Sequence, residues 1–121
     1  MTGLIYHITS RAFWSAAQKS GAYSSDSLAN EGFIHCSNKS QILRVANNFF
    51  SNQRGLVILT IDSSKLKPDL RWEAGTGQPG DLFPHIYGPL NMEAVVFVFD
   101  FEQGLDGKFL LPQALASVGS K

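Results

Sequence analysis

The spacing of hydrophobic residues divides the chain into short segments of two kinds. Most are apolar or alternating runs of three to eight residues bounded by Gly, Ser or Asp, which is typical of β-strands. They predict strands over 4–9, 32–37, 56–62, 70–74, 85–87, 94–101 and, in the tail, 109–111.

Two segments have helical spacing instead. The first covers 11–20, with Ser10 as its N-terminal cap and Gly21 as its stop. The second opens with Asn38 and Gln41 at the spacing of a capping box, and its apolar residues then follow at helical intervals: Ile42, Val45, Phe49 and Phe50. Weaker signals predict one helical turn, a mobile glycine-rich loop and a weak helix, over 22–31, 75–81 and 112–118.

The predicted strands outnumber the helices and do not alternate strictly with them. This order favours an α+β fold with a mixed sheet and two or three short helices. A length of 121 residues fits a single domain over 1–121 with its own core.

Composition narrows the classes of partner. Ten basic and ten acidic residues cancel, so no basic surface indicates nucleic acid as a partner. No apolar run reaches the length of a membrane span, and the first ten residues lack the pattern of a signal peptide. The single cysteine, Cys36, cannot form an internal disulfide, and we expect a cytoplasmic protein.

The three histidines share one pattern. Each is followed two residues later by a hydroxyl, in His7/Thr9, His35/Ser37 and His85/Tyr87. Residues i and i+2 of a strand point to the same face, so each imidazole should lie beside its hydroxyl. We expect the three pairs to line one cleft, although partly buried histidines satisfied by backbone carbonyls would give the same pattern.

Other chemistries have weaker support. The histidines lack the tight spacing of a zinc ligand pair, and no carboxylate stands at a fixed offset from all three, so no metal is expected. Cys36 should face the core, away from His35, so we expect no Cys–His nucleophilic pair. Nothing resembles the G-x-S-x-G elbow of serine hydrolases.

Arg71, Trp72 and Glu73 have two interpretations. They form either an edge strand with an Arg71–Glu73 ion pair over a core tryptophan, or a strand that supplies Glu73 as the acidic partner of the histidine cleft. The glycine-rich loop that follows could then close over a ligand.

Several segments also resemble a known family. "LIYHIT", "EGFIHCS", "QILRVANNFF", "LVILTID", "LRWE" and "FPHIYGPLNMEAVV" occur in the order found in the domain of unknown function 952 family. The resemblance covers about residues 3–101 and leaves 102–121 as a C-terminal tail. The family is similar in turn to small members of the ADP-ribosyltransferase superfamily.

That second resemblance implies two bent sheets in a split barrel whose cleft takes NAD or an ADP-ribose-type ligand. It implies that His7 bonds the ribose or the nicotinamide amide and that Thr9 supports it. The superfamily's glutamate would fall near His85 and Tyr87, where this chain has none.

We therefore expect binding of NAD, ADP-ribose or a related phosphorylated nucleotide, with ADP-ribosyl or phosphoryl transfer as the reaction if the protein is an enzyme. The alternatives are a non-catalytic nucleotide-binding module and a structural or interaction module. The expected catalytic residues are His7, His35, His85 and Glu73, and the expected ligand-binding residues are Thr9, Ser37, Tyr87, Arg71 and Arg11. With imidazoles and arginines as the positive groups, affinity should favour anionic nucleotides and should rise on mild acidification.

Overall fold

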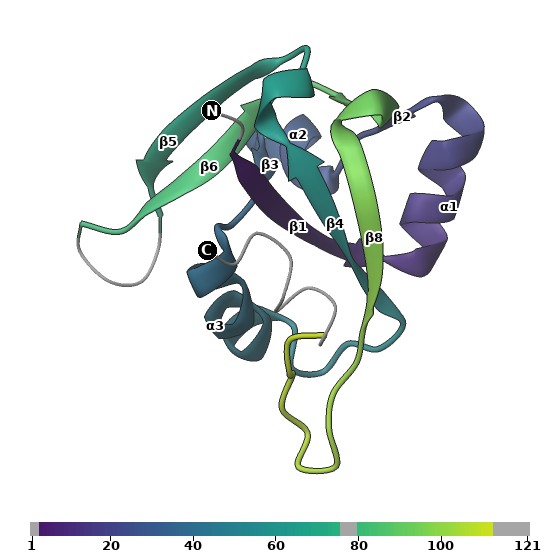
Figure 1. The fold of residues 1–121 in the computed structure, drawn as a ribbon, viewed down its shortest axis with the longest axis vertical. Coiled ribbons are helices and arrows are strands. Elements are labelled where there is room, and N and C mark those ends of the chain that lie inside the picture. The colour runs from purple at the N-terminus through teal and green to yellow at the C-terminus, as the bar shows by residue number, and fades with distance from the viewer. Residues whose placement is uncertain (1–2, 76–79, 113–121) are drawn as a thin grey trace.

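Over the residues that the structure describes, the fold is built from three small antiparallel sheets and three α-helices (Figure 1). The structure is a computed structural model, and it describes residues 3–75 and 80–112. The helices are α1 (Arg11–Ser20), α2 (Asp26–Glu31) and α3 (Lys39–Phe49), and two short 3₁₀ turns are η1 (Ser63–Lys65) and η2 (Met92–Ala94). The strands are β1 (Leu4–Ser10), β2 (Ala22–Tyr23), β3 (Ile34–His35), β4 (Leu56–Asp62), β5 (Asp69–Ala74), β6 (Leu82–Tyr87), β7 (Leu90–Asn91) and β8 (Val95–Phe101).

The sheets have the strand orders β1-β4-β8, β3-β6-β5 and β2-β7. Every pair of strands is antiparallel, so the predicted α+β class is confirmed but the predicted mixed sheet is wrong. Alternation along a strand reports which faces are buried and says nothing about the direction of its neighbour. A backbone bridge between Tyr6 and Ser37 joins the edge of β1 to the segment after β3, and the described residues form no closed barrel.

The core lies on both faces of the β1-β4-β8 sheet. Ile5, Val57, Leu59 and Ile61 pack on one face with residues of α1, β3 and β6. The opposite face packs against α3 and the start of the tail, through a cluster that includes Ile8, Ile58, Ile42, Phe101 and Phe109. Burial on both faces explains why β4 reads as a nearly continuous apolar run.

Both predicted helix boundaries are confirmed by their caps. The Ser10 hydroxyl accepts a hydrogen bond from the Phe13 amide, and Gly21 ends α1 in the left-handed region with φ of 93°. Asn38 and Gln41 form the predicted capping box at the start of α3.

The predicted strand 32–37 is shorter in the structure. Only Ile34 and His35 form residue pairs with β6. The Cys36 amide donates a last hydrogen bond to Pro84 of β6, and the chain then turns to the other sheet, where Ser37 pairs with Tyr6 of β1. The helical turn predicted within 22–31 is α2, preceded by the two-residue strand β2.

The tail and the glycine-rich loop are described only in part. Phe109 forms a single bridge with Gln103 in place of the predicted strand 109–111, and it is buried. Most of the predicted helix 112–118 and most of the predicted loop 75–81 lie outside the described residues.

Trp72 is not a core residue. Its exposed fraction is 46%, so the predicted placement of Trp72 in the core is wrong. The interpretation of this segment as an edge strand is correct, because β5 lies at the edge of its sheet. Arg71 approaches Asp69 at 3.8 Å rather than pairing with Glu73. Within the described part of the chain, no helix has the length and apolar character needed to cross a membrane.

Candidate functional site

A cleft of about 680 Å³ opens between β1, α2, β3, β6 and α3. All three histidines line it, together with Thr9 and Ser37. Much of its remaining wall is aromatic, from Tyr6, Phe13, Tyr23, Phe33, Phe49, Phe50 and Phe83. A mostly apolar concave wall with a few polar groups is the usual form of a small-molecule site.

His7 is held on both ring nitrogens by other parts of the protein. Nδ1 lies 2.6 Å from the carbonyl oxygen of His35, and Nε2 lies 2.8 Å from the Tyr23 hydroxyl. Because a carbonyl oxygen only accepts, Nδ1 carries a proton and donates it. The Tyr23 hydroxyl also contacts the Thr9 hydroxyl at 2.9 Å, so His7 and Thr9 share one partner.

The environment of His7 favours the neutral ring. Burial lowers the pKa of His7 from 6.5 to about 4, against the opposing effect of the hydrogen bond to His35. In the neutral ring Nε2 is an acceptor, and it shares the single proton of the Tyr23 hydroxyl with the Thr9 hydroxyl. Burial also raises the pKa of Tyr23 to about 12, which keeps that hydroxyl protonated. In this arrangement His7 fixes β1 to β3 and offers a ligand neither ring nitrogen.

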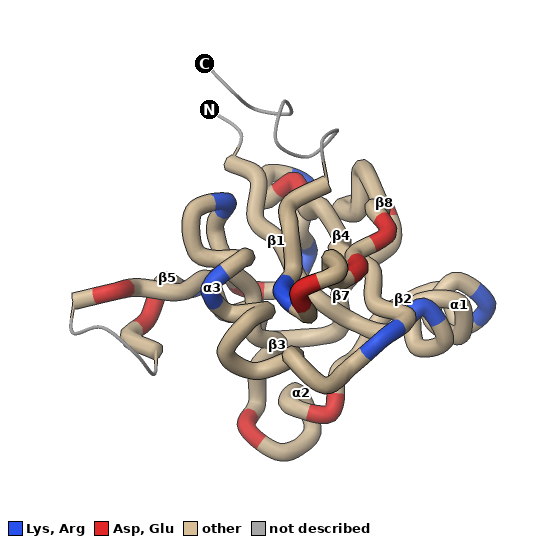
Figure 2. The backbone as a smooth tube through the Cα atoms, turned by 90° about the horizontal axis from the view of Figure 1, so that it is seen from below, with Lys and Arg blue, Asp and Glu red and all other residues tan. Residues whose placement is uncertain are grey.

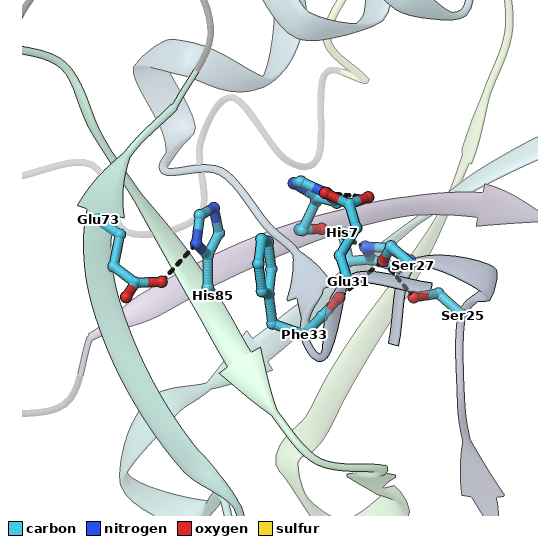
Figure 3. Close-up of polar contacts among 8 residues, drawn as sticks. His7, Ser25, Ser27, Glu31, Phe33, Glu73 and His85 are labelled. Carbon is cyan, nitrogen blue, oxygen red and sulfur yellow. Dashed lines mark hydrogen bonds and ion pairs between the residues drawn. The ribbon is translucent and has the colours of Figure 1, made fainter. Parts of the chain in front are cut away.

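His85 has a carboxylate partner. Its Nδ1 lies 2.8 Å from Oε1 of Glu73 on the neighbouring strand (Figure 3). The Tyr87 hydroxyl donates to the same oxygen at 2.5 Å. The hydrogen bond from Tyr87, and after it the one from His85, lowers the pKa of Glu73 below its usual value. The same bond to Glu73 raises the pKa of Tyr87. His85 and Tyr87 thus share the Glu73 carboxylate as a hydrogen-bond partner, just as His7 and Thr9 share the Tyr23 hydroxyl.

His35 is the most exposed of the three imidazoles. Its Nε2 lies 3.1 Å from Oε2 of Glu31 at the end of α2. Phe33 contacts both of these histidines: its ring stacks on His85 at a centroid distance of 4.1 Å and meets His35 edge-on at 4.8 Å. The His35 and His85 ring centroids are 5.3 Å apart.

The two predicted arginines lie away from the cleft wall. Arg11 pairs with Asp100, and Arg71 places its guanidinium 4.5 Å from the centroid of the Tyr87 ring. Among the described residues the charged side chains that line the cleft are both acidic, Asp26 and Glu31. Figure 2 shows the stretch of α2 with acidic positions and no basic one.

Sequence reasoning missed Tyr23 and Glu31 as site residues. Tyr23 follows α1 in a segment predicted to be a loop, and its contacts with His7 and Thr9 are 16 and 14 positions away. The spacing of Glu31 and His35 was a weak signal, because no helix joins these two residues. Within the described residues, no group of three or more His, Cys, Asp or Glu side chains is arranged to hold a metal ion.

The fold and the cleft define a small α+β protein with antiparallel sheets and an aromatic, histidine-lined cavity. The chain belongs to the family described as protein of unknown function (DUF952), whose sequence pattern matches residues 8–98. The predicted family membership is confirmed, and the likeness to ADP-ribosyltransferases stays a prediction.

Solved structures of one protein are similar to this chain. The crystal structure of protein CC0527 from Caulobacter crescentus has 39% sequence identity and a TM-score of 0.83, and the match covers 93% of this chain and 98% of that chain. The solution NMR structure of CC0527 has 38% identity and a TM-score of 0.76, covering 96% and 97% of the two chains. No protein of curated function matches this sequence.

Proposed function

We propose that the cleft binds NAD in its oxidised form and that it holds the nicotinamide–ribose end. The observation that carries this proposal is the charge of the lining: the described wall is aromatic and contains Asp26 and Glu31 but no lysine or arginine. The oxidised nicotinamide ring is a flat cation. An aromatic wall with two carboxylates attracts such a cation and repels a phosphate.

Aromatic faces are available for this ring. Phe13 and Phe49 line the cleft and have exposed fractions of 57% and 61%. A cation over an aromatic face gains about 0.5–2 kcal/mol, depending on how far it is desolvated. Exposed aromatic rings of this kind are favourable platforms for a flat heterocycle.

Polar groups at the same wall suit ribose hydroxyls. The Glu31 carboxylate is about half exposed and has hydrogen-bond capacity beyond its contact with His35. Ser25 and Ser27 also line the cleft, and their hydroxyls lie 2.8 Å apart. The phosphates and the adenosine would extend through the cleft mouth into solvent. The lining therefore argues against the expected preference for anionic nucleotides, because its fixed charges repel a diphosphate.

Calorimetric titration with oxidised NAD, nicotinamide riboside and ADP-ribose tests the proposal. We expect oxidised NAD and nicotinamide riboside to bind with similar affinity and ADP-ribose, which lacks the nicotinamide, to bind at least about tenfold more weakly, since desolvated cation–π contacts contribute up to about 2 kcal/mol. Mass spectrometry of the same samples for free nicotinamide separates an enzyme from a binding module.

A matched pair of variants locates the site. Glu31→Gln should weaken binding of nicotinamide riboside by about two- to fivefold, as expected for one partly exposed charge. Glu102→Gln removes a carboxylate that does not line the cleft and should leave binding unchanged. Binding of ADP-ribose as tight as that of nicotinamide riboside would contradict the proposal.

A further inference from the structure

The hydrogen bonds of His85 determine which ring nitrogen carries the proton. The Glu73 carboxylate only accepts, so Nδ1 of His85 is protonated and donates to Oε1. The Tyr87 hydroxyl donates to the same oxygen and holds the carboxylate in place. In the neutral ring the lone pair therefore lies on the other nitrogen, Nε2.

Nε2 is directed away from Glu73 (Figure 3). No described residue forms a hydrogen bond with it, although the side chain is only 5% exposed and lines the cleft. Stacking on Phe33, with 18° between the ring planes, fixes the plane of the imidazole. An imidazole that is buried and oriented, and whose second nitrogen has no partner among the described residues, is unusual for a histidine that serves packing alone.

We infer that Glu73 and His85 form a general-base pair, in which Nε2 of His85 removes the proton from a hydroxyl group of water or of an alcohol held in the cleft. A carboxylate that fixes the tautomer and orientation of an imidazole is the arrangement that enzymes use for this task. His85 contacts the reacting hydroxyl, and Glu73 and Tyr87 are positioning residues. The inference depends on the proposed function in one respect only: both place their ligand in the same cleft.

Several ionisable groups surround the pair. On its own sheet, Glu73 accepts from Nδ1, the Tyr87 hydroxyl donates to Glu73, and Arg71 lies over the Tyr87 ring. From β3, the His35 ring lies 5.3 Å away with Glu31 as its partner. His35 is thus the second imidazole that could act on the same molecule, and any test has to separate the two.

A neutral ester gives a test that needs no knowledge of the natural substrate. With p-nitrophenyl acetate, a water oxygen bonds to the carbonyl carbon while its proton passes to Nε2. The bond from that carbon to the aryl oxygen breaks, p-nitrophenolate leaves with the electron pair, and Nε2 returns its proton to solvent. The second proton of the water stays on the new carboxyl group until the released acetic acid ionises in solution, so the products are acetate and p-nitrophenolate.

The tautomer can be measured on the unaltered protein. Nitrogen-15 NMR of the His85 ring, at a pH where the ring is neutral, should show the proton on Nδ1 and a bare Nε2. Glu73→Gln should increase the population with the proton on Nε2, because an amide can donate to Nδ1 as well as accept from it. A proton on Nε2 of the neutral wild-type ring would overturn the inference.

Rates of p-nitrophenyl acetate hydrolysis provide the second readout. Since general-base catalysis typically contributes 10²–10⁴-fold, we expect His85→Gln to lower the protein-catalysed rate at least about tenfold, and Glu73→Gln to lower it about as much. His35→Gln tests the second imidazole, and we expect it to lower the rate less than His85→Gln does. Glu102→Gln, which does not line the cleft, is the control and should leave the rate unchanged. An unchanged rate in a folded His85→Gln variant would overturn the inference; if the variant does not fold, the tautomer measurement decides.

Adding nicotinamide riboside separates this inference from the proposed function. It should slow ester hydrolysis by occupying the cleft. If it has no effect while the His85 and Glu73 variants behave as expected, the general-base pair stands and the proposed ligand is wrong.

Discussion

Acidification from about pH 6.5 to 4 should destabilise this protein by about 3 kcal/mol more than it destabilises a His7→Gln variant. Burial lowers the pKa of His7 to about 4 in the folded protein, whereas the ring titrates near 6.5 when the chain is unfolded. Between these two values the unfolded chain binds the extra proton and the folded protein does not. Stability therefore rises with pH across this window, and the contribution of the neutral ring is fully present only above about 6.5.

Urea unfolding at a series of pH values, followed by circular dichroism, measures this difference. Carboxylate titrations contribute equally to both proteins and cancel in the comparison. His35→Gln is the control for loss of a histidine, because His35 is half exposed and bonds a carboxylate rather than a buried hydroxyl. Parallel curves for wild type and His7→Gln would show that the ring is not held neutral in the folded protein.

Phe101→Ala should lower the free energy of unfolding by about 3–5 kcal/mol, the usual cost of truncating a fully buried phenylalanine. Phe101 is 1% exposed and stacks on Phe109 at a centroid distance of 4.7 Å, so the substitution leaves a cavity beside α3. This contact also attaches the start of the tail to the sheet, and its loss should expose Phe109.

Trp72→Ala is the matched comparison for Phe101→Ala. It removes a larger side chain from a position that is nearly half exposed on the edge strand β5, and we expect a loss below about 1 kcal/mol. Denaturant unfolding of both variants gives the two values. Equal losses would contradict the placement of Trp72 at the surface and of Phe101 in the core.

The sequence predicted which histidine and hydroxyl lie side by side on each strand, but not the side chain to which both members of a pair are hydrogen-bonded. His7 and Thr9 were expected on one face, as were His85 and Tyr87, because strand geometry requires it. The structure adds Tyr23 as the partner of the first pair and Glu73 as that of the second. Glu73 was among the two interpretations of its strand, whereas Tyr23 was missed because its contacts depend on tertiary packing that local patterns do not report.

The errors in the predicted fold have similar causes. The alternation in β5 correctly places Trp72 on the opposite face from Arg71 and Glu73, but it does not say which face is covered. The segment 32–37 has strand-like residues throughout, but it leaves the sheet of β6 after Cys36, because the backbone of Ser37 bonds to Tyr6 of β1 instead. In contrast, the caps at Ser10 and Asn38 depend on contacts three residues apart, so the sequence was sufficient to locate them.

The position of bound oxidised NAD within the cleft tests the central claim most directly. Isotope-filtered NMR of the labelled protein with unlabelled oxidised NAD reports which ligand protons lie near which aromatic rings. We predict contacts between the nicotinamide protons and the rings of Phe13 or Phe49, with the adenine protons free of contacts inside the cleft. Contacts of the adenine protons with these rings, or contacts confined to the exposed Phe97 on β8, would contradict the account.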